Sequence, residues 1–181
     1  MGICARRELV PCSAMNLYFL RHGIAVERDE FDYANDAARQ LTPKGKKQLR
    51  TTAAALRMME LHFDVILSSP LVRARQTAEI IAAELKLKKH LALADELKPG
   101  GSAKKLAQRI SGLKPRAENV LLVGHEPDFS ELISLFVTGH AGGGFALKKG
   151  GLAKLEIEKL RAGKCALLAW LLTPAQMKRM R

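Results

Sequence analysis

Three short apolar runs that each end in polar residues constrain the fold of this chain more than any other feature. The runs cover residues 16–20, 65–67 and 119–123. Runs of this length are typical of buried strands. The segments that follow them predict helices over residues 43–59, 71–85 and 128–137. Strands that alternate with helices predict an α/β fold, namely a three-layer sandwich with a mostly parallel central sheet and helices on both faces.

Three polar residues stand where the N-caps of predicted helices are expected. They are Thr42, Ser102 and Asp128. The second of them predicts a further helix over residues 103–110, and residues 90–93 are a candidate short strand. Residues 27–40 are polar and lack a sustained apolar period, so they predict a loop.

Two closing segments predict a hairpin. Residues 152–157 partly alternate apolar and charged side chains, which indicates a half-exposed strand. Residues 164–172 are more uniformly apolar and predict a more fully buried strand. This pair would add two antiparallel strands to the sheet.

The length and the cysteines limit the domain organisation and the compartment. A chain of 181 residues predicts one domain, which we place at residues 15–181. Residues 1–14 predict a disordered extension. Three cysteines without regular spacing argue against a disulfide framework or a zinc site, so reduced thiols and a cytoplasmic location are expected. No apolar run approaches the roughly 18 residues of a membrane helix.

The formal net charge is +12, from 30 Lys and Arg against 18 Asp and Glu. Such a balance indicates either a partner rich in phosphate or simply a solvated basic surface. The lysines form small clusters, not one tract, and no aromatic side chains are interleaved with them to stack on bases. Both interpretations therefore stay open from the charge alone.

Polar clusters follow the three strongest strands. They are Arg21-His22-Gly23, the segment from Ser68 to Arg73, and Gly124-His125. Ligands of open α/β sheets bind beyond the carboxyl ends of the strands, so these clusters are expected to meet at one site. Two arginines and two histidines suit a tetrahedral dianion, because guanidinium groups bind phosphate oxygens in pairs and imidazole can attack phosphorus.

The same three segments resemble the histidine phosphatase superfamily, which includes phosphoglycerate mutases and acid phosphatases. Leu20-Arg21-His22-Gly23 is similar to its signature, and residues 68–78 and 123–127 are similar to its second phosphate-binding and second histidine segments. The small size and the segment Leu41-Thr42-Pro43-x-Gly45 resemble the SixA branch of phosphohistidine phosphatases. The resemblance covers residues 15–172 and implies a phosphoglycerate mutase-like fold.

The resemblance also implies roles. His22 matches the nucleophile that becomes phosphohistidine, Arg21 and Arg73 match the phosphate clamps, and His125 matches the second histidine, which binds phosphate and stabilises charge. A backbone carbonyl near Gly23 is expected to hold the proton on the other nitrogen of His22. No metal or other cofactor is expected.

An acid that protonates the leaving oxygen is common in the superfamily. Asp95 and Glu96 stand in the expected region, and we favour Glu96. An imidazole leaving group needs this proton less than an alkoxide does, because the P–N bond is labile.

Three functions remain as hypotheses. The favoured one is removal of phosphate from phosphohistidine on a protein, so that the partner is a phosphorylated protein. The second is a phosphatase for small phosphate esters; a mutase is disfavoured because the chain is short. The third is a phosphate- or nucleic-acid-binding module without turnover, which the histidines argue against. No membrane partner is expected.

Overall fold

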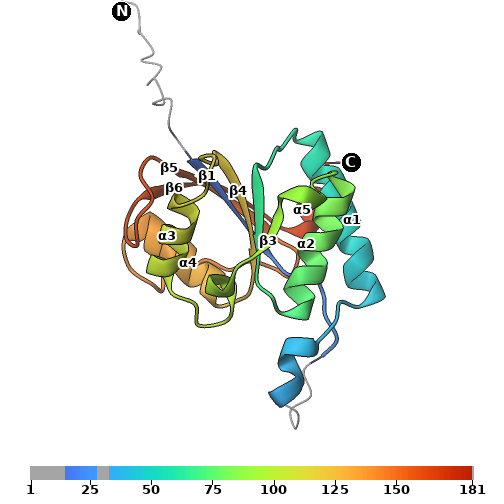
Figure 1. Cartoon of the computed structure of the whole chain (residues 1–181). Helices are drawn as coiled ribbons and strands as arrows, with labels where there is room; N and C mark the ends of the chain where they lie inside the picture. Colours follow the sequence, from blue (N-terminus) through green and yellow to red (C-terminus); the bar gives the residue numbers. More distant parts are fainter. Residues whose placement is uncertain (1–14, 28–32, 181) are drawn as a thin grey trace, which may run out of the picture.

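A mixed six-stranded sheet forms the centre of the computed structural model, which describes residues 15–27 and 33–180 (Figure 1). The strand order is β3-β2-β4-β1-β5-β6. The strands are β1 (Met15–Arg21), β2 (Val65–Ser68), β3 (Leu91–Leu93), β4 (Asn119–Gly124), β5 (Leu152–Ile157) and β6 (Ala166–Leu172). The first four strands pair in parallel, whereas β5 is antiparallel to both β1 and β6. The predicted parallel sheet with a closing hairpin is confirmed.

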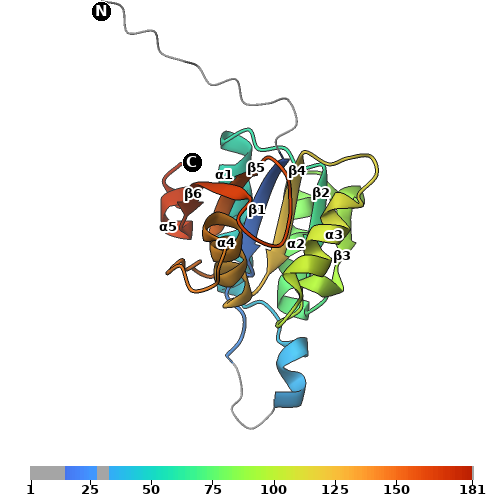
Figure 2. The ribbon, with the colours of Figure 1, turned by 90° about the vertical axis from the view of Figure 1, so that its left-hand side faces the viewer.

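Helices cover both faces of this sheet, as the predicted sandwich requires (Figures 1 and 2). On one face lie α1 (Pro43–Met58), α2 (Val72–Glu84) and α5 (Pro174–Lys178), and on the other lie α3 (Ala103–Ser111) and α4 (Asp128–Thr138). The described residues also form three short 3-10 helices in the connections: η1 (Tyr33–Ala38), η2 (Lys88–His90) and η3 (Asp95–Leu97). Among the described residues, no helix combines the length and apolar character that a bilayer crossing needs.

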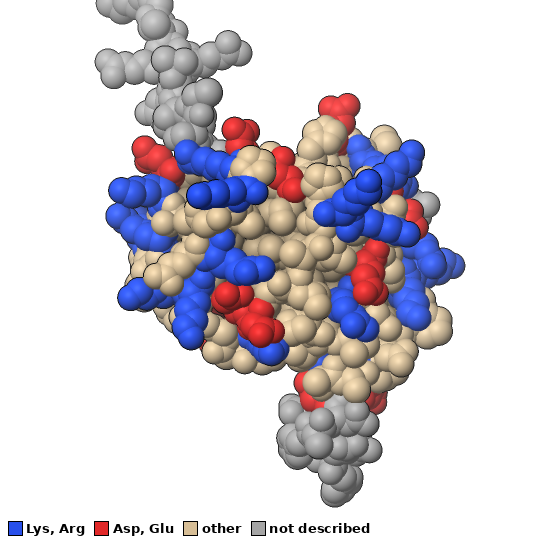
Figure 3. Space-filling model, viewed as in Figure 1, with Lys and Arg blue, Asp and Glu red and all other residues tan. Residues whose placement is uncertain are grey.

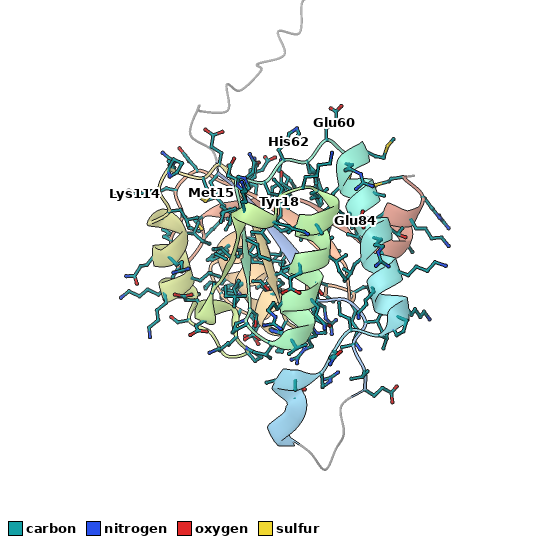
Figure 4. The ribbon with its side chains drawn as sticks, turned by 45° about the vertical axis from the view of Figure 1, so that its right-hand side comes forward. Met15, Tyr18, Glu60, His62, Glu84 and Lys114 are labelled. Atoms are coloured by element: carbon teal, nitrogen blue, oxygen red, sulfur yellow. The ribbon has the colours of Figure 1, made fainter. Side chains whose placement is uncertain are left out.

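Alternate residues of the central strand β1 supply the two halves of the core. Phe19 faces α4, where its ring meets Phe129 edge-on at a centroid distance of 5.2 Å. Tyr18 faces the opposite side and meets Phe63 in the same way at 5.0 Å. Because strand side chains alternate between faces, one strand anchors both helical layers. Glu60, His62 and Lys114 lie near the end of the sheet at which β1 begins with Met15 (Figure 4), whereas the predicted phosphate site lies beyond the carboxyl end of β1, after Arg21.

Two of the three predicted caps are confirmed. The Thr42 hydroxyl accepts a hydrogen bond from Gly45 N at 3.0 Å, and Ser102 accepts one from Lys105 N at 3.4 Å. The prediction for Asp128 is wrong, since Pro127 holds the N-cap position and Asp128 is already the first helical residue. Its carboxylate instead accepts a hydrogen bond from Gly100 N at 2.8 Å, which ties the loop after η3 to α4.

The structure differs from the predictions at residues 164–172 and within residues 27–40. Residues 164–172 are predicted to be more buried than the half-exposed residues 152–157, and the structure shows the reverse, because β6 is an edge strand with Leu167 72% exposed whereas β5 lies between β1 and β6. Within residues 27–40, where a loop was predicted, Tyr33–Ala38 forms η1, and residues 28–32 lie outside the described part. The predicted extension, residues 1–14, also lies outside it, so the domain boundaries stay predictions.

Candidate active site

The carboxyl ends of β1, β2 and β4 meet at the edge of the sheet from which η1 projects (Figure 1). The backbone N–H of His22 donates to Gly124 O at 3.0 Å, and that of Ser69 donates to Val123 O at 2.9 Å. The rings of His22 and His125 lie with their centroids 5.3 Å apart. The predicted convergence of the three polar clusters is therefore confirmed.

The His22 imidazole is buried and held in one tautomer. Its Nδ1 lies 2.7 Å from Gly23 O, and a carbonyl can only accept, so Nδ1 carries the proton. The expected carbonyl near Gly23 is thus that of Gly23 itself. Gly23 N in turn donates to the Thr77 hydroxyl at 3.1 Å, and that hydroxyl donates to Arg73 O at 2.7 Å. Nε2 is therefore the unprotonated nitrogen of the neutral ring. It accepts no hydrogen bond from any described residue, so its lone pair is available.

Both histidines are neutral at pH 7. Burial lowers the pKa of His22 to about 4; the hydrogen bond to Gly23 acts in the opposite direction, and the charges of Arg73, Arg21 and Lys149 lower it further. Burial likewise lowers the pKa of His125 to about 3, with Arg73 as the next cause. A neutral imidazole is the nucleophilic form, so burial keeps His22 ready to attack an electrophile.

Arg73 is buried at the start of α2 and is held by η1. Its Nη1 donates to Asp36 O at 2.7 Å, and its Nη2 lies 3.1 Å from the Asp36 carboxylate, which also accepts from Arg39 at 2.7 Å. Burial alone would raise the pKa of Asp36, but the hydrogen bonds and charges of Arg39 and Arg73 outweigh it and lower the pKa. An ionised carboxylate therefore lies beside this guanidinium.

Arg21 is held by the segment that precedes β5. Its Nη1 donates to Leu147 O at 2.7 Å, while Leu147 N donates to the Glu126 carboxylate at 2.9 Å. Gly150 N donates to both Arg21 O and His22 O at 3.1 Å, which closes this segment over the end of β1. The Nε of Arg21 is buried and has no hydrogen-bond partner among the described residues.

His125 lies against the loop that follows β2. Its Nε2 is 2.9 Å from the Ser69 hydroxyl, whereas its Nδ1 is buried without a partner in the described part of the chain. A buried polar atom left unpaired is costly, and two such atoms in one site indicate a polar ligand there.

Known proteins place this arrangement in a family. Residues 17–98 match the family described as "Histidine phosphatase superfamily (branch 1)". An uncharacterised protein of Picosynechococcus sp. is 42% identical over 143 residues, which cover 78% of this chain and 85% of that protein. The chain belongs to the histidine phosphatase superfamily.

Within the superfamily, the similarity is to the SixA type. The phosphohistidine phosphatase SixA of Escherichia coli is 26% identical over 165 residues, which cover 91% of this chain and 97% of that protein. The structure of the protein histidine phosphatase SixA complexed with tungstate superposes with a TM-score of 0.75 at 25% identity, covering 89% of this chain and 98% of that one. The expected phosphoglycerate mutase-like fold is thereby confirmed.

The superfamily's expected site residues are mostly brought together. The rings of His22 and His125 lie 5.3 Å apart, and the charges of Arg21 and Arg73 are near enough to lower the pKa of both histidines. Glu96 lies apart from these contacts, in η3, where its carboxylate is 3.9 Å from Arg109 Nε on α3. Its role as an acid stays a prediction.

Among the described residues at or beside the site, five carried no expected role: Asp36, Ser69, Thr77, Glu126 and Lys149. Ser69 and Thr77 stand inside the phosphate-binding segment, which was the available signal. Asp36 lies in a polar stretch without periodicity, and nothing in its neighbours marks it.

Among the described residues, no group of three or more His, Cys, Asp or Glu side chains is arranged to hold a metal ion.

Proposed function

We propose that this chain is a phosphohistidine phosphatase that acts on a phosphorylated protein through a phosphohistidine intermediate on His22. The observation that carries the proposal is the fixed tautomer of His22, whose Nδ1 proton is held by Gly23 O while Nε2 stays neutral. Nε2 attacks phosphorus, the bond from phosphorus to the substrate nitrogen breaks, and water then hydrolyses the new P–N bond and restores His22.

The surrounding donors suit the transferred group. The transition state of phosphoryl transfer spreads negative charge over the equatorial oxygens, so catalysis depends on cations and positioned donors. Arg21 and Arg73 supply the cations, and the unpaired buried atoms of Arg21 and His125 supply further partners for phosphate oxygens. The similarity to SixA bound to tungstate, a tetrahedral oxyanion like phosphate, supports this assignment.

The carboxylates favour an imidazole as the leaving group. Asp36 is ionised beside Arg73 and so cannot donate a proton, and Glu96, whose role as an acid stays a prediction, lies 3.9 Å from Arg109 Nε. An alkoxide leaves slowly without a proton donor. Phosphorylated imidazole can take its proton from solvent on the ring and leave as neutral imidazole, so a site of this kind suits phosphohistidine better than an ester.

We also place this activity in the cytoplasm, where a reducing environment would keep free thiols such as Cys165 reduced. The substrate would then be a cytoplasmic protein or domain that carries phosphohistidine.

Phosphate release from a phosphohistidine peptide tests the proposal. We expect His22→Asn to lower kcat/KM by at least about a thousandfold, because it removes the nucleophile. His62→Asn, which changes an exposed histidine far from the site, is the matched control and is expected to retain full activity. Full turnover by His22→Asn would exclude the mechanism, whereas turnover of small phosphate esters without turnover of the peptide would favour the ester phosphatase.

A further inference from the structure

A hollow of about 590 Å³ runs along the outer side of α2, separate from the catalytic residues. Its floor is aliphatic and includes Ile80, Ala83 and Leu91. Three cations line it, and they come from α1 and η2: Lys46, Arg50 and Lys88. We call this hollow the α2 groove.

The α2 groove carries an excess of positive charge. Lys46 and Lys88 have no acidic partner among the described residues, whereas Arg50 Nε is 3.8 Å from the Glu84 carboxylate. The single acid in the lining, Glu79, is 3.5 Å from Arg75 and is thereby compensated. At its far end the groove continues into a second hollow that shares Lys88 and adds three more basic side chains, Lys86, Lys89 and His90. In Figure 3, Lys and Arg side chains lie over α1 and α2 at the right of the view, and others lie over α3 at the left.

The near end of the α2 groove adjoins the active site. Gln76 lines the groove and stands three residues after Arg73 on the same helix. Its side-chain carbonyl accepts a hydrogen bond from Leu41 N at 2.8 Å, which fixes the segment between the groove and the site. From Gln76 to Ala83 the helix rises about 10 Å, the length of about three extended residues. The groove thus begins about one helical turn from Arg73 and extends away from it along α2.

We infer that the α2 groove binds an acidic segment of the phosphorylated protein, next to its phosphohistidine. The inference rests on the proposed function. Charge complementarity favours acidic side chains, and the aliphatic floor gives their apolar neighbours a surface to pack on. A nucleic acid suits the groove less well, because no aromatic side chain lines it for base stacking and Glu79 lies within it.

Binding is measured first, without catalysis. The probe is a fluorescein-labelled peptide with an unphosphorylated histidine followed by six Glu and Asp residues. The control peptide carries Ser and Gln in place of the acidic residues. The groove variant Lys46→Glu/Lys88→Glu is compared with Lys104→Glu/Lys105→Glu, which makes the same charge change at exposed positions of α3 on the other face of the sheet. We expect the groove variant to weaken binding of the acidic peptide about tenfold and the control by less than about twofold.

Turnover is measured next, with the same two peptides carrying phosphohistidine. Wild-type enzyme is expected to show a KM for the acidic peptide that is about five- to tenfold lower, with similar kcat, and the groove variant is expected to lose this preference. Hydrolysis of free phosphoramidate reports the folded active site and is expected to be unchanged in both variants.

The outcomes separate the two proposals. If the acidic peptide binds through the groove but the enzyme hydrolyses neither phosphorylated peptide, the groove is supported and the proposed function is overturned. Turnover without a preference for the acidic peptide, or equal losses in both double variants, would overturn the groove. The choice of a peptide ligand is tested by competition with a single-stranded oligonucleotide of equal charge. If the oligonucleotide displaces the labelled peptide as effectively as unlabelled acidic peptide does, that choice is overturned.

Discussion

The active site and the α2 groove are both cationic, yet their charges are held in opposite ways. Arg73 is 5% exposed and bonded to Asp36, and Arg21 is bonded to the backbone of Leu147. Among the described residues, Lys46 and Lys88 of the groove have no acidic partner; Lys88 is exposed and Lys46 is partly exposed. Electrostatic interactions are several times stronger at a buried site than at a solvated surface, where salt also screens them. The site can therefore supply chemistry, whereas the groove can supply only a graded preference among substrates.

Loss of a buried clamp should have the largest effect. We expect Arg73→Ala to lower kcat/KM for a phosphohistidine peptide about a thousandfold, because in the proposed mechanism it removes a fixed cation from the equatorial oxygens. Arg75→Ala, two residues away and ion-paired with Glu79 at the surface, is the matched control; with a peptide that carries no acidic residues it should retain activity within about twofold. Equal losses in the two variants would mean that buried and exposed cations are not functionally different.

The support of His125 should matter next. We expect Ser69→Ala to lower kcat/KM about tenfold, since one hydrogen bond that orients a buried imidazole is lost. The control is Ser111→Ala at the exposed end of α3. A Ser69→Ala enzyme with unchanged steady-state kinetics would show that His125 is oriented by packing alone.

Burial of two neutral histidines also predicts how stability depends on pH. Their folded pKa values, about 4 for His22 and about 3 for His125, lie below the unfolded value of 6.5, so the unfolded chain binds more protons between these limits. The free energy of unfolding should therefore be highest above pH 6.5 and should fall on acidification, by up to about 1.4 kcal/mol per pH unit for each histidine.

Urea unfolding of wild type and of His22→Asn/His125→Asn between pH 7.5 and 4.5 measures this dependence. The double variant should lose less stability on acidification. Parallel curves for the two proteins would contradict neutral burial of the histidines.

Salt should give the smallest effect and the clearest contrast between the two regions. On going from about 50 to about 300 mM NaCl, we expect KM for an acidic phosphohistidine peptide to rise about threefold, because the groove is screened. Hydrolysis of free phosphoramidate should change by less than that. Equal salt dependence of both reactions would remove the distinction.

The sequence predicted the fold well because its signals were local. Buried runs such as residues 119–123 and caps such as Thr42 depend on near neighbours in the chain. The burial of residues 164–172 was predicted wrongly because an edge position depends on strand order, which the composition of one strand does not contain. The prediction of Asp128 as an N-cap was wrong for a related reason, since its carboxylate accepts a hydrogen bond from a distant loop.

The site was predictable only where residues resembled a motif. His22 and His125 stood in recognisable segments, whereas Asp36 reaches Arg73 across 37 residues. The basic groove was hidden for the same reason. Its lysines belong to two small clusters, near residues 46 and 88, and only the packing of α1 beside α2 brings them together.

Chemical trapping of the intermediate tests the central claim most directly. Wild-type enzyme is mixed with phosphohistidine peptide, quenched within one turnover in alkali, where phosphohistidine survives, and digested for mass spectrometry. The account predicts phosphate on His22, with none trapped in His22→Asn. Phosphate on His125, or steady turnover with no phosphorylated residue of the enzyme, would contradict it.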